Sequence, residues 1–337
     1  MIIVLKSAAT VETTAELIEL IASKGLKPLH MPGTERTVIG ALGDPRALAE
    51  LDLANHAIVE SVRHILAPYK LVTREFHPHD TLVKLGPVLV GGGRFVVGAG
   101  PIRAGSDAVT GLHARELATA GVRLFRCADS FSSLSTYLDP SEDNRDYLTI
   151  CSAARDAGLP SIVEVREMAD VPIAAQQADA LELRRLGEPR LLNAVAHANK
   201  CVLLARGASD TLEQLLLAAE RIVAQGNPSV ILCERGTCSF DQALPRVTDF
   251  GAVAWLKQHT HLPVMLDPAH SAGSDLLVPA LTAAALAVGA DGVFVNSVTT
   301  AGVGTTRAGS GLDASALYKL LTNLRALAVQ LGKECAE

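Results

Sequence analysis

Aromatic side chains and clustered positive charges are both scarce in this sequence. Phe, Trp and Tyr together make up 4% of the 337 residues, and the formal net charge is −6. Proteins that bind nucleic acids commonly use basic stripes and aromatic stacking platforms, and the sequence shows neither. We therefore expect no nucleic-acid partner. The acidic balance still allows small anionic metabolites, because these need only a few local cations.

Long apolar runs and paired cysteines are missing as well. No apolar run reaches the roughly 18 residues of a membrane span, and the first residues lack the charged start and cleavage site of a signal peptide. The six cysteines include no CxxC pair, so we expect reduced thiols and no disulfide framework. This pattern is typical of a soluble cytoplasmic protein with no membrane partner.

The hydrophobic pattern changes its rhythm part of the way along the chain. Residues 1–74 show the β-α-β-β-α-β order of a ferredoxin-like α+β domain, and residues 75–92 form the expected linker. Across residues 93–337, short buried strands alternate with amphipathic helices about eight times. That pattern predicts a (β/α)8 TIM barrel of the α/β class. An open doubly wound sheet is the structural alternative.

Arginines lie near most of the predicted barrel strand ends. A TIM barrel holds its chemistry at the carboxyl ends of its strands, and six of the eight predicted ends have an arginine close by. A single arginine is more often a solvated or salt-bridged residue, but guanidinium groups that converge suit phosphate or carboxylate. The sequence therefore predicts a mouth that accepts a small anionic metabolite. The predicted substrate-binding residues are Arg103, Arg126, Arg185, Arg206, Glu234, Arg235 and Asn296.

His270 follows a short apolar strand and the turn Asp267-Pro268-Ala269. Strand ends of this kind carry metal ligands and proton-transfer groups in α/β enzymes, and a neutral imidazole can act as a general acid or base. Cys127 and Asp129 follow another predicted strand. A thiol beside Arg126 would ionise more readily and could act as a nucleophile. An inert, half-buried thiol is the alternative.

Several motifs resemble those of one enzyme family over nearly the whole chain. ERTVIGALGD, FHPHDT, CERG and DPAHSAG are similar to motifs of type Iβ 3-deoxy-D-arabino-heptulosonate 7-phosphate (DAHP) synthases. The resemblance implies a TIM barrel behind a ferredoxin-like domain that often binds an aromatic amino acid. It also implies a metal-dependent condensation of phosphoenolpyruvate with erythrose 4-phosphate, and a homo-oligomer, either a dimer or a tetramer.

The family's divalent metal has four ligands, a Cys, a His, a Glu and an Asp. Matching the motifs residue by residue places Ile102, His270, Asn296 and Arg307 at these four positions. One imidazole and one neutral amide hold a divalent ion poorly, and Arg307 would repel it. We therefore expect no metal and no cofactor. Arg307 would place a fixed cation there, able to stabilise an oxyanion or hold a carboxylate.

Three functions follow as hypotheses. The first is a recruited, metal-independent lyase or transferase that acts on a small anionic metabolite of shikimate-type or secondary metabolism. The second is a non-catalytic paralogue that regulates or assembles with a pathway enzyme. The third is an active DAHP synthase with a rearranged site. For the first, the predicted catalytic residues are His270, Arg307, Cys127 and Asp129.

Overall fold

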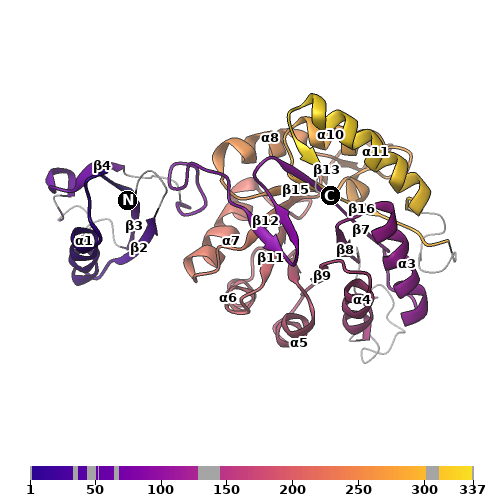
Figure 1. The fold of residues 1–337 in the computed structure, drawn as a ribbon, viewed down its shortest axis with the longest axis horizontal. Helices are drawn as coiled ribbons and strands as arrows, with labels where there is room; N and C mark the ends of the chain where they lie inside the picture. The colour runs from indigo at the N-terminus through magenta and orange to yellow at the C-terminus, as the bar shows by residue number, and fades with distance from the viewer. Residues whose placement is uncertain are drawn as a thin grey trace. The chain divides into compact units, whose positions relative to one another are not determined.

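The structure is a computed structural model of the chain, and it forms two compact units, Met1–Pro78 and His79–Glu337 (Figure 1). The residues that the structure describes are 2–32, 37–43, 51, 53–63, 68–127, 145–300 and 311–335. Within them, no helix is long and apolar enough to cross a membrane.

The N-terminal unit is a four-stranded antiparallel sheet with one described α-helix, α1 (Val11–Ser23). Thr10 caps α1, because its hydroxyl accepts from the Thr13 backbone amide while the Thr13 side chain accepts from the Thr10 amide. The unit confirms the predicted ferredoxin-like fold. Its sheet order is β2-β3-β1-β4, with β1 Ile2–Leu5, β2 Lys27–Pro32, β3 Thr37–Leu42 and β4 Val59–Arg63.

The second unit is a closed barrel of eight parallel strands, so the predicted TIM barrel is confirmed. Parallel pairing of the last barrel strand, β16, with the first, β7, closes the ring. The strands, in order around the ring, are β7 Arg94–Gly100, β8 Leu124–Arg126, β9 Ser161–Glu164, β10 Ala180–Leu183, β11 Cys201–Ala205, β12 Val230–Glu234, β15 Val264–Leu266 and β16 Gly292–Asn296.

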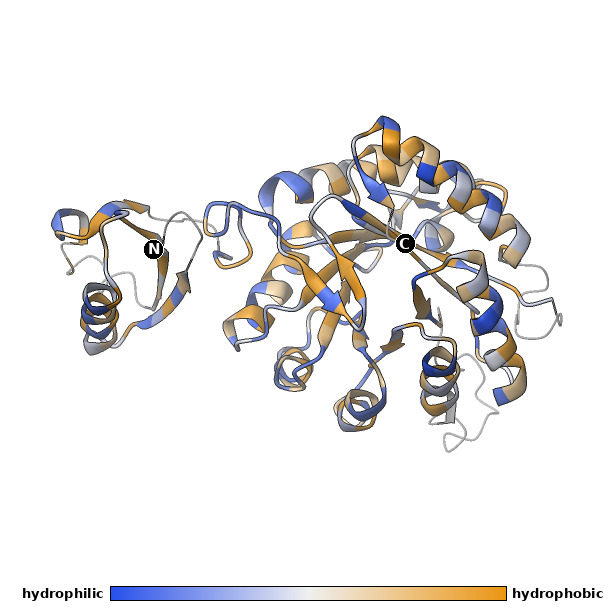
Figure 2. Ribbon diagram, viewed as in Figure 1, coloured by the Kyte–Doolittle hydropathy of each residue, from blue (hydrophilic) through white to orange (hydrophobic). Residues whose placement is uncertain are grey.

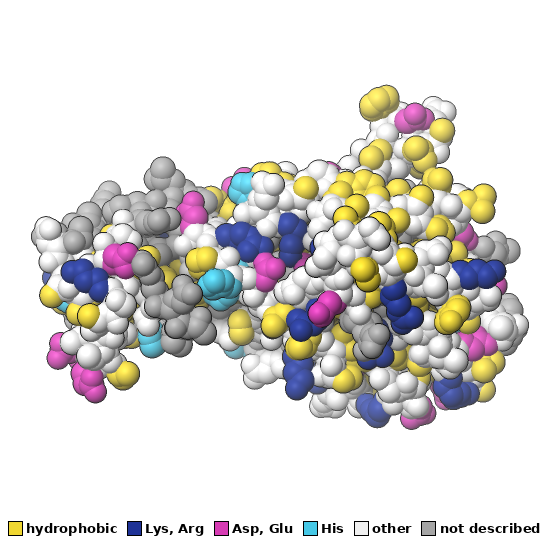
Figure 3. Space-filling model, turned by 45° about the horizontal axis from the view of Figure 1, so that its top comes forward, with side chains coloured by type: hydrophobic (Ala, Val, Ile, Leu, Met, Phe, Trp, Pro, Cys, Tyr) yellow, Lys and Arg dark blue, Asp and Glu magenta, His cyan; other side chains and the backbone are white. Residues whose placement is uncertain are grey.

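Helices surround the strands on the outside (Figure 1). Apolar colour predominates on the barrel strands, whereas the helices alternate in hydropathy, as expected when a parallel sheet is covered on its outer face (Figure 2). On the face drawn in Figure 3, acidic and basic side chains are interspersed over the barrel. The helices are α3 Asp107–Ala120, α4 Arg145–Asp156, α5 Asp170–Gln177, α6 Pro189–His197, α7 Leu212–Ala224, α8 Phe250–His259, α9 Pro268–Ser271, α10 Val278–Ala287 and α11 Ala314–Gln330.

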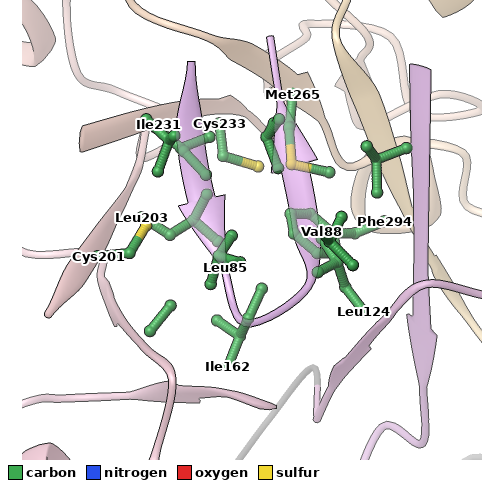
Figure 4. Close-up of a cluster of buried hydrophobic side chains, with 14 of the residues drawn as sticks. Leu85, Val88, Leu124, Ile162, Cys201, Leu203, Ile231, Cys233, Met265 and Phe294 are labelled. Carbon is green, nitrogen blue, oxygen red and sulfur yellow. The ribbon is translucent and has the colours of Figure 1, made fainter. Parts of the chain in front are cut away.

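A β-hairpin covers the amino ends of the barrel strands. It consists of β5 (Val83–Leu85) and β6 (Val88–Val90) and lies within the segment expected as a linker. Its apolar side chains join one buried cluster with strand residues such as Phe294, and Figure 4 shows Leu85 and Val88 among them. Because the hairpin covers this end, which we call the floor, the carboxyl strand ends form the opposite mouth. Two short pairings lie outside the ring. Strand β13 (Thr237–Cys238) pairs with β14 (Arg246–Val247), and β17 (Glu334–Cys335) pairs with β7.

Candidate functional site

Buried charges occupy the carboxyl ends of the strands at the mouth. Arg126 ends β8, and its side chain is only 3% exposed. Its Nε lies 2.7 Å from Oε2 of Glu182 and its Nη2 2.8 Å from Oε1, while its Nη1 lies 2.8 Å from Oδ2 of Asp267. Burial opposes the charge on Arg126, but Glu182 and Asp267 outweigh it and raise the pKa of the guanidinium. Arg126 is therefore a fixed cation inside the barrel.

Glu182 connects Arg126 to a second arginine. Arg184 Nε lies 2.7 Å from Oε1 of Glu182, and Arg184 Nη1 lies 3.0 Å from Oε2 of Glu164. Glu182 is fully buried. Although burial raises the pKa of this carboxyl, Arg126 and Arg184 outweigh burial and lower it. The result is a chain of alternating charges along β8, β9 and β10, in which each buried charge has a partner of opposite sign.

His270 is positioned by Arg235. Nη2 of Arg235 lies 2.9 Å from Nδ1 of His270, and Nε of Arg235 lies 3.4 Å from Oδ2 of Asp267. A guanidinium can only donate, so Nδ1 accepts and the ring proton belongs on Nε2. Burial, and after it the charge of Arg235, lowers the pKa of His270 to about 3. The imidazole is therefore neutral at pH 7 and presents an Nε2–H donor.

Asp267 organises this turn through backbone contacts. Its Oδ1 accepts from the backbone amide of His270 at 3.1 Å, which caps the short helix α9, and its Oδ2 faces Arg126 and Arg235. Asp267 therefore bonds to a backbone amide of its own turn and to two arginines. The ring of His270 is oriented by the arginine.

A second ion pair stands at the ends of β11 and β12. Arg206 Nη1 lies 2.8 Å from Oε2 of Glu234 and 3.2 Å from Oδ2 of Asp249, and its Nε donates to the carbonyl oxygen of Asp210. Glu234 is fully buried and also accepts from the Gly236 amide at 2.7 Å. Burial raises the pKa of Glu234. Arg206 is thus held at the mouth with its charge largely compensated.

The remaining predicted residues are distributed more widely. Cys127 is fully buried, and its Sγ donates to the Ile102 carbonyl oxygen at 3.4 Å. Arg103 is half-buried after β7, and Asn296 is half-buried at the end of β16. The side chain of Arg185 is 61% exposed and pairs with Glu188, outside the buried network. Asp129 and Arg307 lie outside the described residues.

The sequence analysis places Arg206 and its partner Glu234 at the mouth, but it does not include the carboxylates that face Arg126 and Arg235. The missed residues are Glu164, Glu182 and Asp267 as parts of one network. A signal was present in the sequence, since SIVE and ALEL each carry a single glutamate in an otherwise apolar or neutral strand. A buried acid of this kind requires a cation, and the arginines near the strand ends were the available partners.

The described residues do not fit the divalent metal that the family resemblance implies. Ile102 has no ligand atom, Asn296 is a neutral amide, and Nδ1 of His270 is bonded to Arg235. No group of three or more His, Cys, Asp or Glu residues in the described ranges could hold a metal ion. A site without metal stays a prediction, since the Arg307 position is outside these ranges.

Comparison with known proteins gives one consistent family. Residues 89–332 match the model of the DAHP synthetase I family, and residues 1–67 match that of the DAHP synthase ferredoxin-like domain. The phospho-2-dehydro-3-deoxyheptonate aldolase of Thermotoga maritima is 36% identical over 98% of this chain and 99% of the relative. A 2-dehydro-3-deoxyphosphooctonate aldolase of Acidithiobacillus ferrooxidans is 30% identical over 42% of this chain and 54% of the relative.

Comparison with solved structures indicates the same family as these sequence relatives. The crystal structure of the Thermotoga maritima DAHP synthase superposes with a TM-score of 0.76 at 34% identity and covers 99% of both chains. A truncated form of the same organism's synthase gives a TM-score of 0.72 at 33% identity, over 80% of this chain and 99% of that one. The resemblance drawn from the motifs is confirmed.

Proposed function

Because this chain belongs to the DAHP synthetase I family, we propose that it is an aldolase-type enzyme whose substrates are phosphoenolpyruvate and erythrose 4-phosphate. The observation that carries the proposal is the 36% identity to a phospho-2-dehydro-3-deoxyheptonate aldolase over 98% of the chain. This reverses the order of the three hypotheses drawn from the motifs. The active synthase, placed last there, is better supported than a recruited activity or a non-catalytic paralogue.

The proposed reaction balances with one molecule of water. C3 of phosphoenolpyruvate forms a bond to the aldehyde carbon of erythrose 4-phosphate, and the aldehyde oxygen takes up a proton. Water supplies the oxygen that becomes the 2-keto group, and the bond to the phosphate of phosphoenolpyruvate breaks. The products are a seven-carbon 2-dehydro-3-deoxy sugar acid phosphate and inorganic phosphate. Both substrates are anionic, which suits a mouth that contains several arginines.

Arg206, Arg235 and His270 are the residues that we assign to this chemistry. Arg206 and Arg235 are held by buried carboxylates, so their guanidinium groups keep their positions when a phosphate or carboxylate binds. His270 is neutral and already oriented through Nδ1. Its Nε2–H can donate a hydrogen bond to the aldehyde oxygen as negative charge develops there.

An assay of product formation tests the proposal. The purified protein is incubated with both substrates, after metal removal and again with added Mn²⁺, and phosphate release is followed. We expect release only when both substrates are present, and a loss of about 100-fold in kcat for His270→Ala, the size typical of one oxyanion donor. Arg190→Gln, a charge change at an exposed helix residue, should leave the rate unchanged. Absence of phosphate release under both conditions would refute the synthase.

Two residues favour a second candidate function. Ile102 and Asn296 stand where the family has the Cys and Glu ligands, which supports a metal-independent enzyme on another small anionic metabolite. A thermal-shift screen of the metal-stripped protein with shikimate-type acids would distinguish them. Stabilisation by one acid, together with indifference to Mn²⁺ and no synthase activity, would favour this candidate. No shift with any compound would favour a non-catalytic paralogue.

A further inference from the structure

A cavity of about 600 Å³ lies at the floor of the barrel, away from the mouth. Its wall includes the turn of the β5–β6 hairpin, residues at the starts of β7 and β8, the last turns of α11, and β17. Strand β17 forms its side by pairing with β7, with Glu334 opposite Arg94 and Cys335 opposite Phe95. The cavity is therefore built by segments that are far apart in sequence.

Positive charge dominates this floor cavity. Arg94, Arg123, Arg325 and Lys333 line it, against the single carboxylate of Glu334. Within the described part of the chain, no ion pair involves any of these four cations. The arginines at the mouth, in contrast, face buried carboxylates. Lys333 donates to the Ala290 carbonyl oxygen and lies near the opposite charge of Asp291. The three arginines converge on the floor without an ion pair among the described residues, which favours binding of an anion.

Arg123 also has an unsatisfied hydrogen-bond donor beside this cavity. Its Nε is buried, and no hydrogen-bond acceptor for it exists among the described residues. Buried donors without acceptors are rare in folded proteins because their desolvation is not repaid. Arg123 directly precedes β8, so its backbone is fixed by the barrel. Arg123 as a whole is half-buried and lines the cavity, so an anion there would contact the accessible part of its side chain and would reach Nε only after the side chain turns.

The rest of the lining is apolar. Val88 is buried, Leu89 is half-buried and Val329 is 75% exposed, and all three lie beside the cations. The cavity volume lies within the range of about 300 to 1,000 Å³ of small-molecule sites. Several cations favour a dianion, and arginine forks match phosphate oxygens. We propose that the floor cavity binds a small phosphate monoester, with its phosphate on Arg123 and Arg325 and a compact apolar group against Leu89 and Val329.

This site is separate from the mouth. Arg94 begins β7 and Gly100 ends it, and at about 3.3 Å per residue the two ends of the strand are about 20 Å apart. A ligand bound in the floor cavity therefore cannot contact His270, which lies at the opposite end of the barrel. The inference goes beyond the proposed function, because it adds a second ligand site that does not depend on which reaction the mouth catalyses.

Calorimetric titration of the whole protein with phenyl phosphate tests the site. The arginines at the mouth can also bind phosphate, so variants are needed to show at which of the two sites a binding event occurs. We expect one binding event that survives Arg235→Gln at the mouth. The dissociation constant of the same event should rise about tenfold or more in Arg325→Gln and in Arg123→Gln, because each variant loses a charge-assisted contact. Arg221→Gln, an equal charge change on the exposed last turn of α7, should bind like the unmodified protein.

Three results would overturn the proposal. The first is unchanged binding in both Arg123→Gln and Arg325→Gln. The second is loss of all binding in Arg235→Gln, which would place the only event at the mouth. The third is binding of benzoate as tight as that of phenyl phosphate, which would remove the phosphate assignment. Arg325 is exposed, so its variant should fold and can decide the question alone if Arg123→Gln is unstable.

Discussion

Glu182 shows at the scale of one residue how the barrel holds charge in its interior. The side chain is fully buried at the end of β10 and contacts two arginines, Arg126 and Arg184. A charge in this position is costly without partners, and with partners it fixes their orientation. Arg126 in turn reaches Asp267, which holds Arg235 and, through it, His270. One glutamate therefore supports the contacts that run from Arg126 to His270.

Replacing Glu182 with Gln should destabilise the protein by about 3 to 5 kcal/mol, because Arg126 would lose its bidentate carboxylate partner inside the barrel. The measurement is the free energy of unfolding from urea denaturation. Glu188→Gln is the matched control: it removes an exposed partner of Arg185, and such surface pairs contribute about 1 kcal/mol or less. A Glu182→Gln variant as stable as the control would contradict the view that this network supports the fold.

At the scale of elements, closure of the barrel depends on a close approach between strands. Gly292 begins β16, which pairs with β7 and closes the ring. A Cβ added at Gly292 would lie 2.3 Å from the Val96 carbonyl oxygen and 2.8 Å from Cε of Met265. The methionine side chain can move, but the backbone oxygen belongs to the neighbouring strand. A side chain at this position would therefore push the two strands apart.

We expect Gly292→Ala to lower the free energy of unfolding by about 1 to 3 kcal/mol, the usual cost of overpacking a core. Thermal denaturation followed by circular dichroism measures it. Gly187→Ala provides the control, because a Cβ there meets no atom within 4 Å and a Gly-to-Ala change in open space tends to be neutral or stabilising. Equal melting temperatures for both variants would show that the strands can separate at no cost.

At the scale of the whole molecule, each of the two units has its own apolar core. Ile3, Leu17 and Ile39 belong to the N-terminal cluster, whereas Leu203 and Phe294 belong to the barrel cluster. A chain segment with a core of its own and of this size can fold alone.

Residues 79–337 expressed alone should therefore fold into the barrel. We expect cooperative thermal unfolding and near-ultraviolet circular dichroism typical of fixed tertiary packing. A non-cooperative transition with exposed apolar surface would show that the barrel needs residues 1–78. Light scattering on the full chain and on residues 79–337 would measure the molar mass in solution and so test the predicted homo-oligomer, a dimer or a tetramer. A pathway-enzyme partner and a cytoplasmic location also stay predictions.

The sequence by itself determined the architecture of this protein. Alternation of short apolar strands with amphipathic helices is a local pattern, and it predicted the barrel, while the β-α-β-β-α-β order predicted the ferredoxin-like unit. The motifs CERG and DPAHSAG also identified the family and placed Arg235 and His270 at strand ends. These inferences succeed because hydrophobic periodicity and short motifs depend on neighbouring residues.

Only the tertiary structure decided how the charges pair. Arg126 meets Glu182 and Asp267, which are 56 and 141 positions away. Arg184 and Arg185 are neighbours in sequence, yet Arg184 joins the buried network while Arg185 faces solvent. The uncompensated arginines at the floor come together only because the barrel closes and β17 returns to β7. The apolar surroundings of the glutamates in SIVE and ALEL indicate buried acids, but the arginine with which each acid pairs depends on contacts between distant segments and is not recorded in any local pattern.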